Sequence, residues 1–263
     1  MISFRFVVIF LFIPAFCYSQ GKFDFERIED NSFLIEEAYN QEPGVIQHIS
    51  AFQILQDKTW LYTFTEEWPL QGQKHQVSVT IPVLKSGEAG IGDIALNYRY
   101  QAVLTERMAF SPRFSLLLPT GNTGKALGNG VPGYQVNLPA SLILSRKIVT
   151  HYNLGATLIF SARAPDDTRS DITNINYGTS IIYLLSGNLN LMLEIAGNAT
   201  RTKPVSNRVI TENSLYINPG CRFAINFKSG LQIVPGLAFP IGVGEGSGNN
   251  GIFLYLSFEH PLN

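Results

Sequence analysis

The sequence is poor in charge and has no long apolar run after its first residues. Asp, Glu, Lys and Arg make up 15% of the 263 residues, against about 25% in an ordinary soluble domain. The net charge is −1, and basic residues do not cluster among aromatic ones, so nucleic acid is not an expected partner. No stretch of about 18 apolar residues follows the N-terminal region, so a helical membrane protein is not expected.

Residue types that bind metals or form disulfides are also scarce. The two cysteines are Cys17 and Cys221, and Cys17 falls in a predicted leader, which leaves no intrachain disulfide. The four histidines have no metal-ligand spacing, namely His48, His75, His151 and His260. The glycine-rich stretch 121–133 lacks the GxxxxGK[ST] pattern of a nucleotide site. We therefore expect no cofactor and no metal.

The N-terminus is typical of a secretory signal peptide. Arg5 precedes the apolar run Phe6–Ile13, which is too short to cross a bilayer as a helix, and Pro14 ends it. Small residues at 17 and 19 predict cleavage after Ser19, so the predicted signal peptide is residues 1–19. Cleavage after Gln20 is an alternative. Lipidation of Cys17 is less favoured because the bulky Phe16 precedes it.

Residues 20–43 differ from the rest and predict a periplasmic N-terminal segment. Asp30 or Asn31 is placed to cap a short helix over residues 32–39, which Pro43 and Gly44 would end. One interpretation is a helix that docks at the periplasmic end of a barrel. The other is a plug or gate, with Glu36 and Glu37 as its candidate residues.

Residues 44–263 predict an all-β fold built from strands of about ten residues with period-two alternation. In 93–104, one face carries Ile94, Leu96 and Tyr98 and the other carries Asp93, Asn97, Arg99 and Gln101. We count about twelve such strands, which are longer than those of soluble sandwiches. The fold class is therefore a transmembrane, up-and-down antiparallel β-barrel in the outer membrane of a Gram-negative bacterium.

The links between strands alternate in length, as in outer-membrane barrels. Tight turns are expected near residues 105, 146, 186 and 228, and long links over 85–90, 121–133, 162–173, 201–213 and 242–250. The tight turns and both termini are expected on the periplasmic side. Aromatic residues typical of interface girdles are Trp60, Trp68, Tyr98, Tyr100, Tyr134, Tyr152, Tyr177 and Tyr183.

Prolines within the predicted strands conflict with a regular ladder, because proline has no backbone N–H to donate. They are Pro112, Pro139, Pro219 and Pro235. Neighbouring glycines predict bends or bulges that would accommodate them. These glycines are Gly133, Gly155, Gly178, Gly220 and Gly236.

Four stretches resemble a known family. They are residues 31–49 (NSFLIEEAYNQEPGVIQHI), 92–100 (GDIALNYRY), 114–122 (FSLLLPTGN) and 133–137 (GYQVN). The chain is similar here to the outer-membrane family named for the MetA pathway of phenol degradation, over most of its mature length. The resemblance implies a transporter-like barrel, without a proven substrate and without catalytic residues.

If the apolar faces contact lipid, the polar faces line an enclosed lumen. The candidate lumen-lining residues are Asp93, Asn97, Arg99, Arg113, Glu194, Arg222 and Glu259. One interpretation is a network of ion pairs that fills the lumen. The other is a charged constriction that orients a polar or amphipathic solute.

These features predict an outer-membrane channel that passes a small, hydrophobic or aromatic solute by passive diffusion. A non-conducting structural or surface-interaction barrel is the first alternative. The second is a lipid hydrolase in which His151 activates Ser141 or Ser145, although no motif supports an enzyme. Acidic residues in 164–171 offer a loose cation site or a solvated loop. Expected partners are outer-membrane lipid, the solute and the barrel-assembly machinery. The last predicted strand carries Phe258 near its end, but the chain continues to Asn263 and so departs from the terminal aromatic that is common in such barrels.

Overall fold

The computed structural model describes residues 28, 32–85, 87–204 and 209–261. Its first strands are β1 (Val45–Leu55), β2 (Trp60–Leu70), β3 (His75–Lys85), β4 (Ala89–Ile91), β5 (Ala95–Tyr100), β6 (Val103–Leu104), β7 (Met108–Phe110), β8 (Arg113–Leu117), β9 (Gly133–Asn137) and β10 (Ala140–Ser145). The others are β11 (Ile148–Arg163), β12 (Arg169–Leu184), β13 (Leu189–Pro204), β14 (Ile210–Phe223), β15 (Ile225–Asn226), β16 (Gln232–Ala238), β17 (Ile241–Val243) and β18 (Gly251–Pro261). Two 3-10 turns lie in loops, η1 (Thr123–Lys125) and η2 (Gly244–Gly246).

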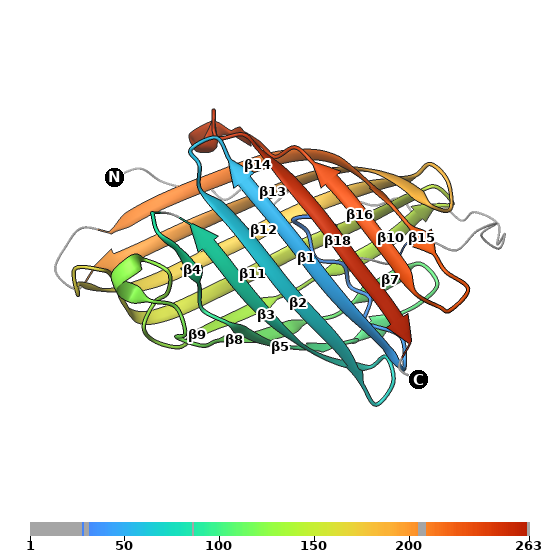
Figure 1. The fold of residues 1–263 in the computed structure, drawn as a ribbon, viewed down its shortest axis with the longest axis horizontal. Coiled ribbons are helices and arrows are strands. Elements are labelled where there is room, and N and C mark those ends of the chain that lie inside the picture. The colour runs from blue at the N-terminus through green and yellow to red at the C-terminus, as the bar shows by residue number, and fades with distance from the viewer. Residues whose placement is uncertain (1–27, 29–31, 86, 205–208, 262–263) are drawn as a thin grey trace, which may run out of the picture.

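The strands form one sheet that closes on itself (Figure 1). Consecutive strands pair antiparallel, and β1 pairs with β18 from Val45↔Pro261 to Leu55↔Gly251. Some of these segments follow one another along a single continuous strand of the barrel, called a stave here, which comprises one to three segments. Counted as staves, the barrel has twelve antiparallel strands. The predicted fold class is confirmed.

Several of these splits fall at prolines. Pro112 separates β7 from β8, Pro139 separates β9 from β10, and Pro240 separates β16 from β17. A residue without an N–H interrupts the ladder, and the stave resumes after it. Pro219 and Pro235 instead lie within β14 and β16.

The wall is apolar outside and polar inside. On β5, Leu96 and Tyr98 are each 41% exposed, whereas Asn97 and Arg99 are 7% and 2% exposed. The same alternation holds on β13, where Leu191 and Leu193 are exposed and Asn190 and Glu194 are buried. Five of the girdle tyrosines are exposed, namely Tyr98, Tyr134, Tyr152, Tyr177 and Tyr183. No helix among the described residues is long and apolar enough to cross a membrane.

The staves differ in length around the barrel. β11, β12 and β13 have 16 residues each, whereas β1, β2 and β3 have 11. At about 3.3 Å per residue the difference is roughly 16 Å of strand. The predicted long link 162–173 is therefore wrong, because residues 164–168 alone join β11 to β12. Much of the link predicted over 201–213 likewise belongs to β13 and β14.

The predicted helix over residues 32–39 is wrong. These residues are a series of bends with no helical hydrogen bonding, because their backbone N–H groups bond to side chains of the barrel instead. The predicted cap residues Asp30 and Asn31, and the predicted signal peptide, lie outside the described residues. Gly44 makes the expected turn into β1, with a φ of 76° that favours glycine.

Candidate functional site

Residues 32–41, called the inner segment here, run through the interior of the barrel (Figure 1). Their polar atoms bond to inward-facing side chains on β3, β5, β10, β11, β12 and β13. Nearly all of these residues are buried. The segment thus crosses the lumen rather than docking at one end of the barrel.

Six backbone N–H groups of the inner segment donate to the wall. Leu34 and Ile35 donate to Glu194, Glu36 to Asn153, Ala38 to Ser141, Asn40 to Gln101, and Gln41 to Gln76, all at 2.7–3.2 Å. Buried backbone donors need partners, since each one left unpaired costs about 1–3 kcal/mol. The wall supplies them in place of a helix.

The carbonyl groups of the segment are satisfied in the same way. The oxygen of Ala38 accepts from Ser111 Oγ at 2.6 Å and from Gln101 Nε2 at 2.9 Å. Arg99 donates to the carbonyl oxygens of Glu37 at 3.2 Å and Tyr39 at 2.6 Å. The inward-facing side chains of the wall are therefore positioned to bond the inner segment along one extended backbone path.

Glu194 on β13 is the anionic anchor of the segment. One carboxylate oxygen accepts from the N–H groups of Leu34 and Ile35 at 3.1 and 3.2 Å, and the other accepts from Asn218 Nδ2 at 2.6 Å. The side chain is fully buried. Hydrogen bonds to a charged acceptor are stronger than neutral ones, so Glu194 fixes the start of the segment.

Glu36 belongs to a cluster of two arginines and two glutamates, which also includes Arg99, Arg113 and Glu67. Arg113 Nε lies 2.9 Å from Glu36 Oε1, and Arg99 Nη1 lies 3.4 Å from the same oxygen. Arg99 Nη2 is 3.8 Å from Glu67 Oε2. Asn137 Nδ2 donates to Glu36 Oε2 at 2.6 Å. The cluster is electrically balanced while Glu36 is in place.

Phe33 and Ile35 fit against glycines of the wall. The ring of Phe33 packs in a tilted geometry against Phe253 and edge-on against Tyr255, at centroid distances of 5.5 and 5.8 Å. A Cβ on Gly220 or Gly236 would come within 2.6 or 2.5 Å of this ring, and one on Gly178 would overlap Ile35 Cδ1.

No β-bulge lies at these glycines. Gly178, Gly220 and Gly236 continue the ladder without a register shift, as do Gly133 and Gly155. The glycines on β12, β14 and β16 instead make room for side chains of the inner segment.

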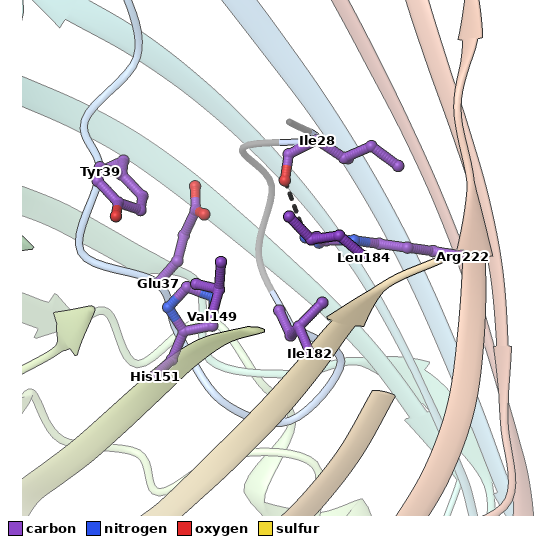
Figure 2. Close-up of a pocket in the computed structure, with 8 residues that line it drawn as sticks. All are labelled: Ile28, Glu37, Tyr39, Val149, His151, Ile182, Leu184 and Arg222. Carbon is purple, nitrogen blue, oxygen red and sulfur yellow. Dashed lines mark hydrogen bonds between the residues drawn. The ribbon is translucent and has the colours of Figure 1, made fainter. Parts of the chain in front are cut away.

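A small cavity lies beside the segment. It measures about 10 Å³ and is lined by Ile28, Glu37, Tyr39, Val149, His151, Ile182, Leu184 and Arg222 (Figure 2). Arg222 Nη2 donates to the carbonyl oxygen of Ile28 at 3.1 Å. This space is too small for an organic solute, since one water needs about as much.

A larger cavity of about 220 Å³ lies on another side of the segment. Its lining comprises Ser32, Phe33, Leu34, Ile35 and Glu36 of the segment and Ile49, Ala51, Thr63, Thr65, Glu67, Ser78, Thr80, Asn97, Arg113 and Tyr255 of the wall. The lining combines hydroxyl groups of β2 and β3 with apolar and charged groups. This mixture suits a small amphipathic molecule.

Ser141 and His151 are brought together, as one alternative reading of the sequence required. Ser141 Oγ lies 2.6 Å from His151 Nδ1. Both side chains are buried inside the barrel, and Ser141 Oγ also accepts the N–H of Ala38. A lipid hydrolase needs a serine that reaches lipid, and this serine is occupied by the inner segment instead.

The predicted lumen residues do not form one cluster. Asn97, Arg99 and Arg113 lie together around Glu36, whereas Glu194 and Arg222 hold other parts of the chain. Glu259 accepts from Gln47 Nε2 at 2.7 Å. Asp93 anchors the loop after β8 by accepting the N–H groups of Gly121 at 3.0 Å and Asn129 at 2.8 Å.

Sequence reasoning missed the neutral residues that hold the segment. Gln101 was placed on a polar face but not in a site, and Gln76, Asn137, Asn153 and Ser111 were not named as site residues. The sequence feature that could have identified these residues is their position on the polar face of a predicted strand. Amide side chains both donate and accept, so they suit an irregular backbone.

The acidic loop between β11 and β12 uses its carboxylates locally. Asp166 accepts from the hydroxyl and N–H of Thr168, and these hydrogen bonds lower its pKa. Asp171 accepts the N–H of Ser161, and Asp167 pairs with Arg163 at 3.6 Å. Across the part of the chain that the structure covers, no three His, Cys, Asp or Glu residues are grouped to hold a metal ion.

No family model matches the sequence, and no curated protein matches it. Among solved structures, the barrel is similar to the COG4313 outer membrane channel from Pseudomonas putida F1, with a TM-score of 0.65, 12% identity and coverage of 85% of this chain and 97% of that chain. It is also similar to the NanC porin, with a TM-score of 0.57, 7% identity and coverage of 82% and 100%. At these identities the likeness shows the fold alone.

A closed barrel with this apolar outer wall is the form in which β-strands cross a bilayer, because closure leaves no unpaired edge in the lipid. The exposed side chains of the wall are mainly large and apolar. The protein is therefore a β-barrel of the bacterial outer membrane.

Proposed function

We propose that this outer-membrane barrel is a channel for a small amphipathic solute, with an apolar or aromatic part, and that the inner segment is its gate. The observation that carries the proposal is the inner segment itself, which lies across the lumen beside a cavity of about 220 Å³. A solute would move by passive diffusion, and would need the segment to shift.

The bonding pattern supports a gate rather than a permanent part of the wall. The segment adds no strand to the barrel, and it is attached by hydrogen bonds between its backbone and wall side chains, by the ion pairs of Glu36 and by the packing of Phe33 and Ile35. Each such bond contributes a net of about 0.5–1.5 kcal/mol. Loss of the segment would leave the ladder from β1 to β18 complete.

The proposed solute follows from the lining of the larger cavity. Phe33, Ile49 and Tyr255 offer an apolar surface, and Thr63 and Thr80 offer hydroxyls. The resemblance to the family named for phenol degradation also implies transport, and membership of that family is part of this proposal. So are the external position of the long loops and recognition of Phe258 by the assembly machinery.

Deleting residues 32–41 tests the gate. In planar bilayers we expect a larger single-channel conductance than for the full-length protein, because the lumen loses its obstruction. Replacing the same ten residues by a glycine-serine linker is the matched control, since it keeps chain length and should conduct like the deletion. Unchanged conductance in both variants, with the barrel intact, would refute the gate.

The non-conducting barrel is the second candidate, because an apolar cluster fills part of the interior. This cluster includes Phe33, Ile143, Ile182, Met192 and Phe253. If it blocks the lumen independently of the segment, the deletion will not raise conductance. Outer-membrane permeability in cells that lack the protein would then also be unchanged.

A further inference from the structure

The carboxylate of Glu36 occupies a binding site built wholly by the wall. Its oxygens face Arg113 Nε at 2.9 and 3.0 Å, Asn137 Nδ2 at 2.6 Å and Arg99 Nη1 at 3.4 Å. These donors come from β5, β8 and β9. Glu36 itself belongs to the segment proposed to move.

The wall holds Arg113 in place without using Glu36. Arg113 Nη1 donates to Asn97 Oδ1 at 2.9 Å and to Ser115 Oγ at 2.6 Å, and Nη2 donates to Gln135 Oε1 at 3.0 Å. All three acceptors are uncharged, so they orient the guanidinium without neutralising it. Its Nε edge is left for a carboxylate, which is the partner that a guanidinium matches best.

The charge balance of the cluster depends on Glu36. With Glu36 present, Arg99 and Arg113 face two carboxylates, those of Glu36 and Glu67. When the segment leaves, Glu67 alone remains, and it is 3.8 Å from Arg99. A buried guanidinium without an anionic partner is costly, so the open state favours an anion at this position.

This site also opens onto the larger cavity, since Glu36, Arg113 and Asn97 all line it. Arg113 and Glu36 keep 20% and 17% of their side chains exposed there. The lining also includes the apolar residues Ile49 and Ala51 on β1, which is four strands away from β8 and Arg113 around the sheet. A molecule in the cavity would therefore meet a carboxylate site at one end and apolar groups at the other.

We propose that Arg113, Arg99 and Asn137 form a receptor for the carboxylate of a small monocarboxylate with an apolar body, and that Glu36 occupies this receptor in the closed state. The solute carboxylate competes with Glu36, and its binding favours release of the segment. This inference deepens the proposed function and rests on it for the link between binding and opening.

The test is binding of butyrate to the full-length protein carrying Glu36→Ala, purified in detergent, with butyramide as the neutral probe of the same shape. Butyrate is expected to raise the midpoint of thermal unfolding by roughly 2–4 °C at saturation, whereas butyramide is not. Ionic strength is held constant because charge interactions are screened by salt. Wild-type protein should show a smaller rise, since Glu36 competes.

Two matched variants localise the effect. Glu42→Ala removes the same charge from an exposed residue just beyond the segment, and its response should equal that of the wild type. The double variant Glu36→Ala with Arg113→Gln should lose the butyrate response. If Glu36→Ala does not fold, Glu36→Gln, which keeps the side-chain volume, is measured instead, and a smaller butyrate-specific rise is expected.

Equal responses to butyrate and butyramide, or a response that survives Arg113→Gln, would overturn the receptor. The readout separates this inference from the channel itself. A butyrate-specific rise without conductance in the deletion variant keeps the receptor and rejects the channel. Conductance in the deletion variant without a butyrate-specific rise keeps the channel and rejects the receptor.

Discussion

Two sides of the inner segment differ in how they meet the wall. Against β12, β14 and β16, Phe33 and Ile35 press on glycines with no intervening space. Toward β2, β3 and β5, a cavity of about 220 Å³ separates the segment from threonine, serine and asparagine side chains. The packed side holds the segment, and the hollow side leaves room for a solute. The stability of the closed inner segment and the selectivity for the solute therefore depend on different residues.

Phe33→Ala should have the largest effect on the packed side. Removing a buried aromatic side chain costs about 3–5 kcal/mol, and here the loss falls on the closed state alone. We expect amide hydrogen exchange of residues 34–38 to accelerate by roughly 100-fold or more. Phe239→Ala is the matched control, because Phe239 is 47% exposed on the outer surface. Equal acceleration in the two variants would contradict the comparison.

Glu194→Gln should loosen the segment less than the loss of Phe33. The amide keeps one oxygen but loses the charge that accepts the N–H groups of Leu34 and Ile35, at a cost of about 1.5–3 kcal/mol. Faster exchange of these two amides, with intact β-sheet by circular dichroism, is the expected result. Glu212→Gln, on an exposed part of β14, provides the control. Unchanged exchange would show that Glu194 does not anchor the segment.

Gly236→Ala tests the fit between wall and segment. The added Cβ would come within 2.5 Å of the Phe33 ring, and such overpacking costs about 1–3 kcal/mol. We expect higher open-channel probability in planar bilayers. The effect should disappear in a Phe33→Ala background, where the ring is already absent. Gly87→Ala is the control, because nothing lies within 4 Å of a Cβ there.

Thr63→Val should have the smallest effect on closure, since Thr63 lies on the hollow side. The change replaces a hydroxyl by a methyl group of similar size, and exchange of residues 34–38 should correspond to less than about 0.5 kcal/mol of change. Solute entry in a liposome-swelling assay should shift in favour of more apolar solutes. A loss of closure as large as that of Glu194→Gln would remove the distinction between the two sides.

Much of the barrel was predictable because it depends on local alternation. Asn97 and Arg99 alternate with Leu96 and Tyr98 in the printed sequence, and the structure places them on opposite faces of the wall. The heights of the staves were less predictable. Residues 169–173 are mostly polar and were taken as part of a long link, yet they belong to β12, whose ladder with β13 begins at Ser170, because a partner strand of the same length is available.

The candidate site was predicted in part. Arg99, Arg113 and Glu36 were named separately, as lumen and plug residues, and the structure joins them. Gly220 and Gly236 were taken as bends, whereas their role is to admit a ring from residue 33. A glycine in the sequence does not indicate which distant side chain will pack into the space beside it, so this role was not predictable.

The sequence by itself determined the barrel and which face of each strand meets lipid, because a period of two fixes the side of every residue relative to its neighbours. Only the tertiary structure decided the path of residues 32–41. Their backbone partners lie far along the chain, 35 residues away at Gln76 and 160 at Glu194. Until the closed wall brings those side chains together, the segment has no local reason to be anything other than a short helix.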